Sequence, residues 1–523
     1  MSFPTLLALS LFSSTYAASV ASGGPGNVLN LEIVNKNLTL DGFSRSTVLA
    51  GGTFPGTPIL ANKGDRLLIN VVDKLTDPTM LRSTSIHWHG VFQDGTSWAD
   101  GTAFVTQCPI SPGHSFLYDF TPTGQAGTFW YHSHLSLQYT DGLRGPLIIY
   151  DPNDPHKRLY DIDNADTIIT LADWFHTPSR NAPFPLFGSS NLINGKGRFA
   201  GGSTSPLAVV SVTRNKRYRF RLISMSAEPN YIFSIDKHDM TVIEADGVST
   251  QPLCVDSMQV FTGQRYSFVL NANQKADNYW IRIVPNIGDT SFDGGVNSAI
   301  LRYTGAPKVD PKPIAAPVSK KPLLETNLHP LVPVPVPGRP YPGGADMSIN
   351  LKMGLDLTAA PRYTMNNVSY SPPSAPALLQ ILSGAQLASD LLPSGSYFAL
   401  PPNKVIEISI PGGEDGGSPH PFHLHGHNFH VIRSAGSKTY NYKNPVIRDV
   451  VSTGLASDGD NVTFRFITDN SGPWFLHCHV DIHLDIGLAV VFAEDVQGTS
   501  KEVVPNAWKN LCPTYNSLKP DQL

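Results

Sequence analysis

Cysteine, charge and long apolar runs are all scarce in this sequence. Only 4 of its 523 residues are cysteine, too few for a disulfide scaffold of this size. Charged residues make up 15%, well below the roughly 25% of an average soluble protein. The net charge of −4 argues against a nucleic-acid-binding surface, which would need a basic stripe. No apolar run after the N-terminal segment reaches the roughly 18 residues that span a membrane.

Hydrophobic residues, glycine, proline and histidine are plentiful by contrast. Hydrophobic residues make up 41% of the chain, which excludes a disordered acidic protein. The 44 glycines and 44 prolines indicate many turns between short strands. None of these features explains the 17 histidines, so the function of the histidines becomes the main question.

Short runs with alternating or β-branched residues dominate the chain. They include residues 28–34, 66–72, 217–223, 266–270, 405–410 and 462–467. Turn signals such as Asp94-Gly95 and Pro112-Gly113 separate runs of this kind, and helical periodicity is scarce. This pattern predicts an all-β protein built from sandwiches.

Two breaks divide the chain into three units. A polar, proline-punctuated stretch at residues 150–155 follows an apolar run, and residues 305–344 are rich in proline. Each unit is large enough to form its own core. We therefore expect domains at residues 21–152, 153–325 and 326–523.

Residues 1–20 predict a secretory signal peptide. Residues 6–12 form a short apolar core that small residues follow, although the usual positive charge before the core is missing. A buried N-terminal strand is the alternative. Three N-x-S/T triplets fit a secreted glycoprotein; they begin at Asn37, Asn367 and Asn461. We expect a soluble extracellular protein, in a compartment where disulfides persist.

Eight of the histidines form four His-x-His pairs. The pairs are His87 with His89, His132 with His134, His423 with His425, and His477 with His479. Residues i and i+2 of a strand project from one face, so each pair can direct two imidazoles at one point. If the first and last units face each other, eight rings converge, which suits a cluster of two or three metal ions. Surface decoration is the alternative for a single pair and is disfavoured for four.

Cys478 lies between two of these histidines and predicts a second kind of site. Its side chain points to the opposite face of the strand from His477 and His479, so it serves a different metal. His420 and His483 can supply nitrogens there, and a His₂Cys set is typical of a blue-copper electron-transfer site. A structural disulfide at Cys478 is the alternative, and the flanking histidines argue against it.

Four segments together resemble the copper-binding motifs of the multicopper oxidases. They are HWHG at 87–90, WYHSH at 130–134, HPFHLHGH at 420–427 and HCHVDIH at 477–483. Their surroundings are most similar to secreted basidiomycete laccases, and DGLRGPLIIYDP at 141–152 and LINGKGR at 192–198 extend the resemblance. It implies three sequential cupredoxin-like domains, which are Greek-key β-sandwiches. The first and third would each supply half of a trinuclear copper site, the second would supply loops of the substrate pocket, and the third would hold the type 1 copper.

The resemblance also implies a ligand set for four copper ions. His420, Cys478 and His483 would hold the type 1 copper, and His87 and His423 the type 2 copper. The type 3 pair would take His89, His132 and His479 on one ion, and His134, His425 and His477 on the other. Leu488 occupies the axial type 1 position, where methionine would add a weak bond; without that bond we expect a middle-to-high reduction potential. His427 continues the alternation but matches no ligand position, so we expect a structural role for it. Solvated or hydrogen-bonded roles are expected for six further histidines: His114, His156, His176, His238, His329 and His430.

Carboxylates near these motifs are the expected proton-transfer groups. Glu228 matches the position where the family places a carboxylate beside the exposed type 1 histidine, and it would accept a phenol's proton while His483 takes the electron. Asp100 matches a family carboxylate near the type 2 site, and Asp481 is a second candidate for proton supply or ligand orientation. Phe184 would line the substrate pocket.

The remaining cysteines divide unequally. By the resemblance, Cys108 and Cys512 form a bridge from the first domain to the C-terminal tail. The family's second bridge is absent, and Thr140 and Ala227 stand at its matching positions. Cys254 is then left unpaired, and we expect a buried thiol.

The implied function is that of a laccase: one-electron oxidation of phenols and aromatic amines, coupled to reduction of dioxygen to water. We expect a monomer with these small-molecule partners and with no nucleic acid or membrane. One alternative is a multicopper oxidase with another reductant, such as a ferroxidase. The other is a non-enzymatic copper or dioxygen carrier, which would not need the His-Cys-His tripeptide.

Overall fold

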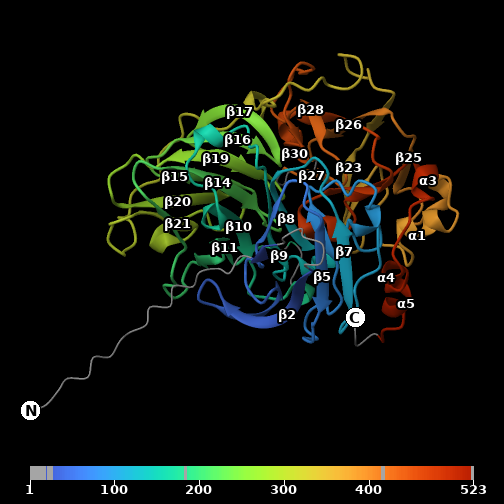
Figure 1. Cartoon of the computed structure of the whole chain (residues 1–523), viewed down its shortest axis with the longest axis horizontal. Coiled ribbons are helices and arrows are strands. Elements are labelled where there is room, and N and C mark those ends of the chain that lie inside the picture. The colour runs from blue at the N-terminus through green and yellow to red at the C-terminus, as the bar shows by residue number, and fades with distance from the viewer. Residues whose placement is uncertain (1–18, 21–27, 182–184, 186, 414–418, 520–523) are drawn as a thin grey trace, which may run out of the picture.

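Three β-sandwiches follow one another along the chain in a computed structural model (Figure 1). The structure describes residues 19–20, 28–181, 185, 187–413 and 419–519. The expected signal peptide lies outside the described residues except for Ser19–Val20, which form β1 and pair with β4. The all-β prediction is confirmed, while the domain boundaries stay predictions.

The first sandwich consists of a four-stranded sheet, β3-β2-β5-β7, and a five-stranded sheet, β1-β4-β9-β8-β6. Both sheets contribute side chains to one apolar cluster. In β5, alternation buries Leu67, Ile69 and Val71 and leaves the intervening residues partly exposed. Its further strands are β2 (Leu29–Thr39), β3 (Ser44–Ala50), β4 (Ile59–Asn62), β5 (Leu67–Asp73), β6 (Ile86–His89), β7 (Ser115–Phe120), β8 (Gly127–Ser133) and β9 (Arg144–Tyr150).

The second sandwich combines a seven-stranded sheet, β12-β11-β10-β14-β19-β16-β17, with a five-stranded sheet, β13-β21-β20-β15-β18. Its strands are β10 (Ile168–Trp174), β11 (Ser190–Ile193), β12 (Lys196–Arg198), β13 (Val209–Val212), β14 (Arg217–Ser224), β15 (Tyr231–Ile235), β16 (Met240–Ala245), β17 (Val248–Val255), β18 (Met258–Val260), β19 (Arg265–Asn271), β20 (Asn278–Pro285) and β21 (Ser298–Tyr303).

The third sandwich has two five-stranded sheets, β22-β26-β31-β28-β29 and β25-β33-β32-β27-β30, and a hairpin, β23-β24. Its strands are β22 (Met347–Asn350), β23 (Met353–Asp356), β24 (Arg362–Met365), β25 (Tyr397–Leu400), β26 (Val405–Pro411), β27 (Pro421–Leu424), β28 (Phe429–Arg433), β29 (Ile447–Arg448), β30 (Val450–Ser452), β31 (Asn461–Ile467), β32 (Gly472–Cys478) and β33 (Ala489–Glu494).

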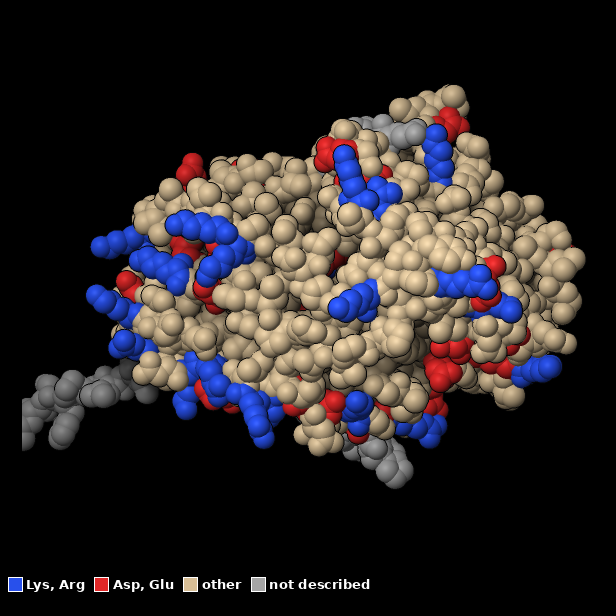
Figure 2. Space-filling view, turned by 90° about the horizontal axis from the view of Figure 1, so that it is seen from above, with Lys and Arg blue, Asp and Glu red and all other residues tan. Residues whose placement is uncertain are grey.

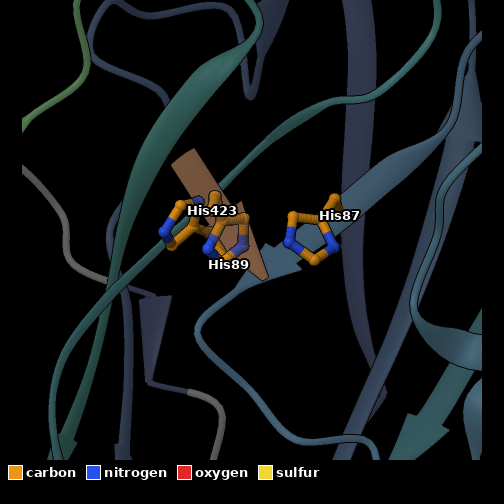
Figure 3. A group of neighbouring side chains, drawn as sticks. All are labelled: His87, His89 and His423. Carbon is orange, nitrogen blue, oxygen red and sulfur yellow. The ribbon is translucent and has the colours of Figure 1, made fainter. Parts of the chain in front are cut away.

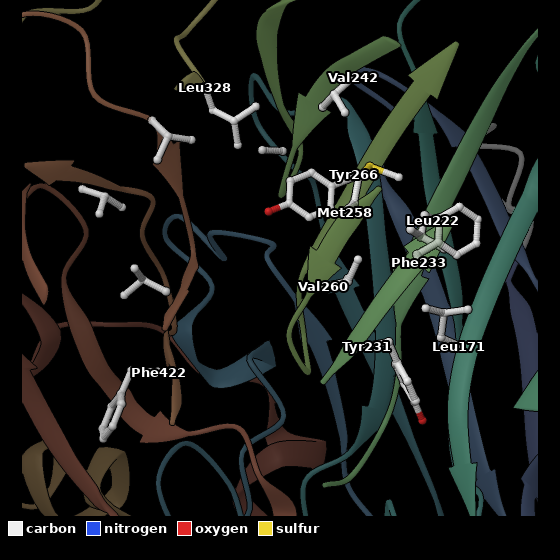
Figure 4. Close-up of a cluster of buried hydrophobic side chains, with 14 of the residues drawn as sticks. Leu171, Leu222, Tyr231, Phe233, Val242, Met258, Val260, Tyr266, Leu328 and Phe422 are labelled. Atoms are coloured by element: carbon white, nitrogen blue, oxygen red, sulfur yellow. The ribbon is translucent and has the colours of Figure 1, made fainter. Parts of the chain in front are cut away.

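The second and third sandwiches share one continuous apolar core. A single cluster of buried side chains runs from Ile169 to Phe492. Figure 4 shows part of it, with Leu171 and Phe233 of the second sandwich and Phe422 of the third. The two sandwiches therefore bury apolar surface against each other, which fixes how the third presents its residues to the first.

Short α-helices lie within the third sandwich and in the tail that follows it, and this tail returns to the first sandwich. The α-helices are α1 (Ala377–Leu382), α2 (Asp481–Asp485), α3 (Val496–Thr499), α4 (Asn506–Lys509) and α5 (Leu511–Asn516). Trp508 donates its indole N–H to the Thr106 carbonyl at 2.9 Å, and α4 and α5 lie beside β7 in Figure 1. Cys108 and Cys512 form the expected disulfide across a separation of 404 residues.

Charged residues are sparse on the face shown in Figure 2, and several arginines are buried in the interior. Figure 2 shows a face on which Lys, Arg, Asp and Glu gather in small groups on a mostly uncharged surface. Among the residues that the structure describes, six arginines are fully buried, and each pairs with a carboxylate: Arg144, Arg221, Arg265, Arg282, Arg448 and Arg465. Breaking a buried pair costs about 3–5 kcal/mol, so these contacts strongly constrain packing. Within the described residues, no helix has the length and apolar character needed to cross a bilayer.

Candidate metal centre

Two antiparallel strand pairs bring the His-x-His motifs together. Strand β6 pairs with β8 so that His87 stands opposite His132. Strand β27 pairs with β32 so that His423 stands opposite His477. In each of the four His-x-His motifs, the second histidine follows the first by two residues and points to the same side. Strand register in two different sandwiches thus creates two half-sites of four imidazoles each.

The two half-sites meet face to face. The rings of His89 and His423 stack with their centroids 3.7 Å apart, and those of His87 and His425 stack at 3.9 Å. Figure 3 shows His87 and His89 on one strand with His423 against His89. All eight side chains are buried. The converging rings predicted from the spacing are therefore present between the first and third sandwiches.

Hydrogen bonds to backbone carbonyls decide which nitrogen four of the eight rings present to a metal. The Nδ1 atoms of His87 and His423 lie 2.8 and 2.9 Å from the carbonyl oxygens of Asp100 and Asp449. His132 and His477 each make the same bond at 2.8 Å with the carbonyl of the following residue. A carbonyl only accepts, so Nδ1 carries the hydrogen and Nε2 keeps its lone pair.

The eight rings form three groups, two of which share His89, and within each group the ligand atoms lie within 4.8 Å of one another. The groups are His87, His89 and His423; His89, His132 and His479; and His134, His425 and His477. The Nε2 atoms of His425 and His477 are 3.1 Å apart, as are Nδ1 of His89 and Nε2 of His479. These distances allow three nitrogens of a group to bind one ion.

The protonation of these rings also suits metal binding. Burial, reinforced by neighbouring imidazoles, holds the pKa values of six rings well below the usual value. Burial lowers the pKa of His477 to about 3. These rings stay neutral, which is the form that binds a metal.

Unsatisfied nitrogens point to the ions that the protein would hold. The buried Nε2 atoms of His87, His132, His134 and His423 have no hydrogen-bond partner within the described residues. A buried polar atom without a partner is costly, and a metal ion would satisfy it. Imidazole and thiolate donors together suit copper, so the residues present fit a copper site.

Cys478 belongs to a separate group on the other face of β32. Its Sγ lies 3.6 Å from His420 Nδ1 and 3.7 Å from His483 Nδ1, and these two nitrogens are 3.2 Å apart. Cys478 is buried, whereas His483, on α2, is only partly buried. Leu488 is buried and accepts the Cys478 N–H through its carbonyl at 3.1 Å. One tripeptide thus contributes to three metal groups.

Asp100 lies directly against the cluster. One carboxylate oxygen is 3.0 Å from His425 Nδ1, and the other is 3.2 Å from His87 Nδ1. Thr102 donates its hydroxyl hydrogen to this carboxylate at 2.6 Å. Sequence reasoning missed Thr102, since a lone threonine in a loop carries no distinctive signal.

Asp481 lies beside a small cavity that reaches the cluster. The cavity holds about 100 Å³, and its lining includes His132, His134, His479 and Asp481. Burial raises the pKa of Asp481 to about 8, and Thr140 donates a hydrogen bond to its carboxylate at 2.6 Å. Thr140, which stands at a position of the missing second bridge, therefore orients this acid.

Glu228 lies outside these metal groups, on the loop between β14 and β15. Its N–H donates to Asp173 at 3.0 Å, and burial followed by the Asp173 charge raises the pKa of Glu228 to about 8. The preceding carbonyl, of Ala227, accepts the Asp481 N–H at 2.8 Å, so the loop contacts the start of the helix that carries His483. Phe184 lies outside the described residues.

Cys254 is exposed, so the expectation of a buried thiol is wrong. It lies on β17, at the edge of the seven-stranded sheet, where the alternation buries Val255 and turns Cys254 outward. His427 belongs to none of the metal groups found among the described residues, and its Nε2 lies 2.8 Å from Glu494. That contact agrees with a structural role.

Sequence profiles of the multicopper oxidase family match residues 32–154, 165–306 and 370–498. Laccase-1 of Trametes villosa is 58% identical over 521 residues, which cover 99% of each chain. The crystal structure of a laccase from Botrytis aclada has a TM-score of 0.82 at 31% identity, covering 97% of this chain and 94% of that one. Fet3p, described as a multicopper oxidase that functions in iron import, has a TM-score of 0.82 at 26% identity, covering 95% of this chain and 98% of that one. The three sandwiches are thus cupredoxin-like, and the chain belongs to the multicopper oxidase family.

Proposed function

We propose that this chain is a laccase, which oxidises phenols and aromatic amines one electron at a time and reduces dioxygen to water. The observation that carries the proposal is the tripeptide His477-Cys478-His479. Its cysteine belongs to one metal group, and its two histidines belong to two others. The 58% identity to a curated laccase over the full chain supports the same activity.

We assign the copper ligands as the resemblance implied. His420, Cys478 and His483 would hold the type 1 copper; His87 and His423 the type 2 copper; His89, His132, His479, His134, His425 and His477 the type 3 pair. When bound, the four copper ions supply the electron storage that reduction of dioxygen to water requires. The backbone on either side of Cys478 provides a short covalent connection between the sites.

At the substrate end, His483 would take the electron from the phenol and Glu228 would take its proton. His483 is the more exposed ligand of its group, so it is the place where a phenol ring can make contact. Glu228, on the loop that contacts the same helix, would accept the phenol's proton at a carboxylate oxygen. The two N–H bonds from Ala227 and Glu228 to Asp173 hold this loop in position.

At the dioxygen end, the cavity beside Asp481 is the proposed entry for a small molecule. It reaches the cluster histidines directly, and its lining also contains Asp485. Asp481 would hold a proton at its buried carboxylate, and Asp100 would relay protons at His87 and His425, which its carboxylate contacts.

We also propose that the protein is a secreted, extracellular, glycosylated monomer. The apolar N-terminal segment and the N-x-S/T triplets support secretion, and Asn37 and Asn367 are exposed. The absence of a membrane-spanning helix among the described residues is compatible with this proposal. N-terminal sequencing of the exported protein would locate the cleavage site.

Oxygen uptake with different reductants tests the function. We expect rapid uptake with a methoxyphenol and slower uptake with ferrous iron. A clear preference for iron would favour a ferroxidase, which the likeness to Fet3p makes the specific rival. No uptake with either, in protein that carries its copper, would favour a carrier.

Cys478→Ser should abolish both the blue absorption and turnover, because the type 1 group loses its thiolate. The cluster ligands remain, so copper should stay in that site. Absorption and metal analysis measure both effects. Cys254→Ser is the matched control: it removes a cysteine that is outside the disulfide, exposed, and outside the metal groups found among the described residues. Retained blue colour in Cys478→Ser would refute the assignment.

A further inference from the structure

The second sandwich supplies no ligand to the groups described above, yet one of its loops forms a wall of the cluster. Gly263 has φ +84°, and a Cβ there would lie 2.9 Å from the His479 ring and 3.1 Å from the His89 ring. The next residue, Gln264, donates to the Val450 carbonyl of the third sandwich at 3.1 Å. This loop therefore packs directly on two ligand rings.

Arg265 extends this wall into a contact among all three sandwiches. Its guanidinium makes two parallel bonds to Asp449 of the third sandwich, at 2.6 and 2.7 Å. Its Nε donates to the Thr128 carbonyl of the first sandwich at 3.0 Å. Arg265 and Asp449 are both fully buried, so this geometry is strongly constrained.

Asp449 in turn contacts a ligand ring. The carboxylate oxygen that takes the shorter Arg265 bond lies 3.2 Å from His89 Nε2. The other nitrogen of the ring, Nδ1, lies 3.1 Å from His479 Nε2, inside the cluster. His89 is thus turned the opposite way from His87 and His423, which present Nε2 and bond through Nδ1.

Gly90 shows how closely this arrangement is fitted. It follows His89 with φ +88°, and a Cβ at this position would lie 2.5 Å from Arg265 Nη2 and 2.8 Å from Asp449 Oδ2. The glycine that ends the HWHG motif thus leaves room for the ion pair. The HWHG motif of the first sandwich therefore lies directly against the Arg265–Asp449 pair, which joins the second and third sandwiches.

We propose that Arg265 is a positioning residue for the copper cluster. By fixing Asp449, it holds the Nε2–H of His89 and so leaves Nδ1 for the ion shared with His132 and His479. The second sandwich thereby controls the orientation of a ligand that it does not contain. The proposal rests on the copper assignment made above, and its test separates the two.

The chain contains a matched control for this pair. Arg282 and Asp236 form an equally buried pair in the second sandwich, with two parallel bonds of 2.8 and 2.9 Å. Neither belongs to a metal group, and no histidine is bonded to their side chains in the described part of the chain. Arg265→Gln and Arg282→Gln therefore each remove one buried arginine from a two-bond pair.

The experiment compares wild type and both variants by copper stoichiometry, electron paramagnetic resonance and absorption, after titration of metal-free protein with copper. Mutation of a residue that hydrogen-bonds a metal ligand typically lowers metal affinity by about 10–100-fold. We expect Arg265→Gln to bind cluster copper that much more weakly, with a reduced type 3 absorption and an intact blue band. Arg282→Gln should destabilise the fold but keep all copper signals.

Each outcome has a separate meaning. Full type 2 and type 3 signals in Arg265→Gln would overturn the proposal, and so would an equal loss in Arg282→Gln, because the effect would then be general destabilisation. Wild-type protein without type 1 and type 2 signals would instead overturn the proposed function. Selective loss in Arg265→Gln supports the positioning role.

Discussion

A histidine ring offers two nitrogens, and the acceptor beside it decides which one remains for a metal. The residue types and the i, i+2 spacing were enough to predict which rings converge. They did not predict which nitrogen each ring presents, because the acceptor can be the next residue, as for His132, or lie in another sandwich, as for His89. Asp449, for example, is 360 residues from His89 and belongs to no recognisable motif. Local pattern therefore predicts the set of ligands, and tertiary packing determines how each one is aimed.

At the same scale, Asp73→Asn should raise the melting temperature at pH 7 and above. Asp73 is fully buried, its Oδ2 lacks a partner among the described residues, and burial raises its pKa from 3.8 to about 8. Because the folded state binds this proton more tightly, the wild type loses stability as the pH rises from about 4 to 8. Asparagine mimics the protonated form and can still accept the Leu75 N–H.

Calorimetry at several pH values tests this prediction. The difference in melting temperature between Asp73→Asn and wild type should vanish below about pH 4 and grow up to about pH 8. The exposed Asp458→Asn serves as control and should show no such growth. A difference that is constant with pH would count against the burial argument.

Glu228→Gln should impair phenol oxidation by about a hundredfold, the lower range for general base catalysis. A non-phenolic dye that gives up only an electron should be affected much less. Since burial raises the pKa of Glu228 to about 8, ionisation should increase wild-type phenol turnover as the pH approaches that value. This limb should be absent from the variant's pH profile of kcat/KM, and Glu228→Asp should restore part of it. Equal losses on both substrates would remove Glu228 from proton transfer.

Strand register is the feature that matters at the scale of elements. The pairing of β6 with β8 and of β27 with β32 places His87 opposite His132 and His423 opposite His477. The His-x-His spacing led us to expect strands here, whereas burial does not alternate in them, because all four strands are buried on both faces. The outward side of β17, where Cys254 lies, was not predicted, because exposure depends on which edge of the sheet remains uncovered.

Cys512→Ser should lower stability without disturbing copper. The disulfide joins α5 to the first sandwich across 404 residues, and losing such a bridge typically costs about 2–4 kcal/mol. The melting temperature should fall, while copper content and the blue band remain those of wild type. Calorimetry with metal analysis measures both, and Cys254→Ser should change neither. Loss of copper in Cys512→Ser would mean that the tail supports the metal centre.

Contacts between sandwiches determine the behaviour of the whole molecule. The first and third sandwiches each supply four imidazoles to the cluster, and the Arg265–Asp449 pair ties in the second. The division into three units followed from composition. The continuous core of the second and third sandwiches did not, since nothing in a linear pattern shows which sandwich faces another.

Removing copper should therefore weaken the association of the sandwiches as well as abolish activity. A ligand that binds only the folded state stabilises it, so chelation should lower the melting temperature. We expect the single transition of the holoprotein to broaden or divide, because the first and third sandwiches lose their shared ions. Scanning calorimetry before and after chelation tests this, and adding copper back should restore the original profile. An unchanged profile would show that protein contacts alone join them.

Because the cluster is divided between two sandwiches, its two halves are synthesised at different times. His479, the last histidine of the second half-site, follows His134, the last of the first, by 345 residues. At roughly 5–20 residues per second, the ribosome needs about 17–69 s to complete the second half-site after the first is complete. During that time the first four imidazoles are an incomplete chelator, open to whichever metal is at hand. Correct metallation is thus a matter of timing: copper is best delivered after translation has ended, when both halves can close on it together.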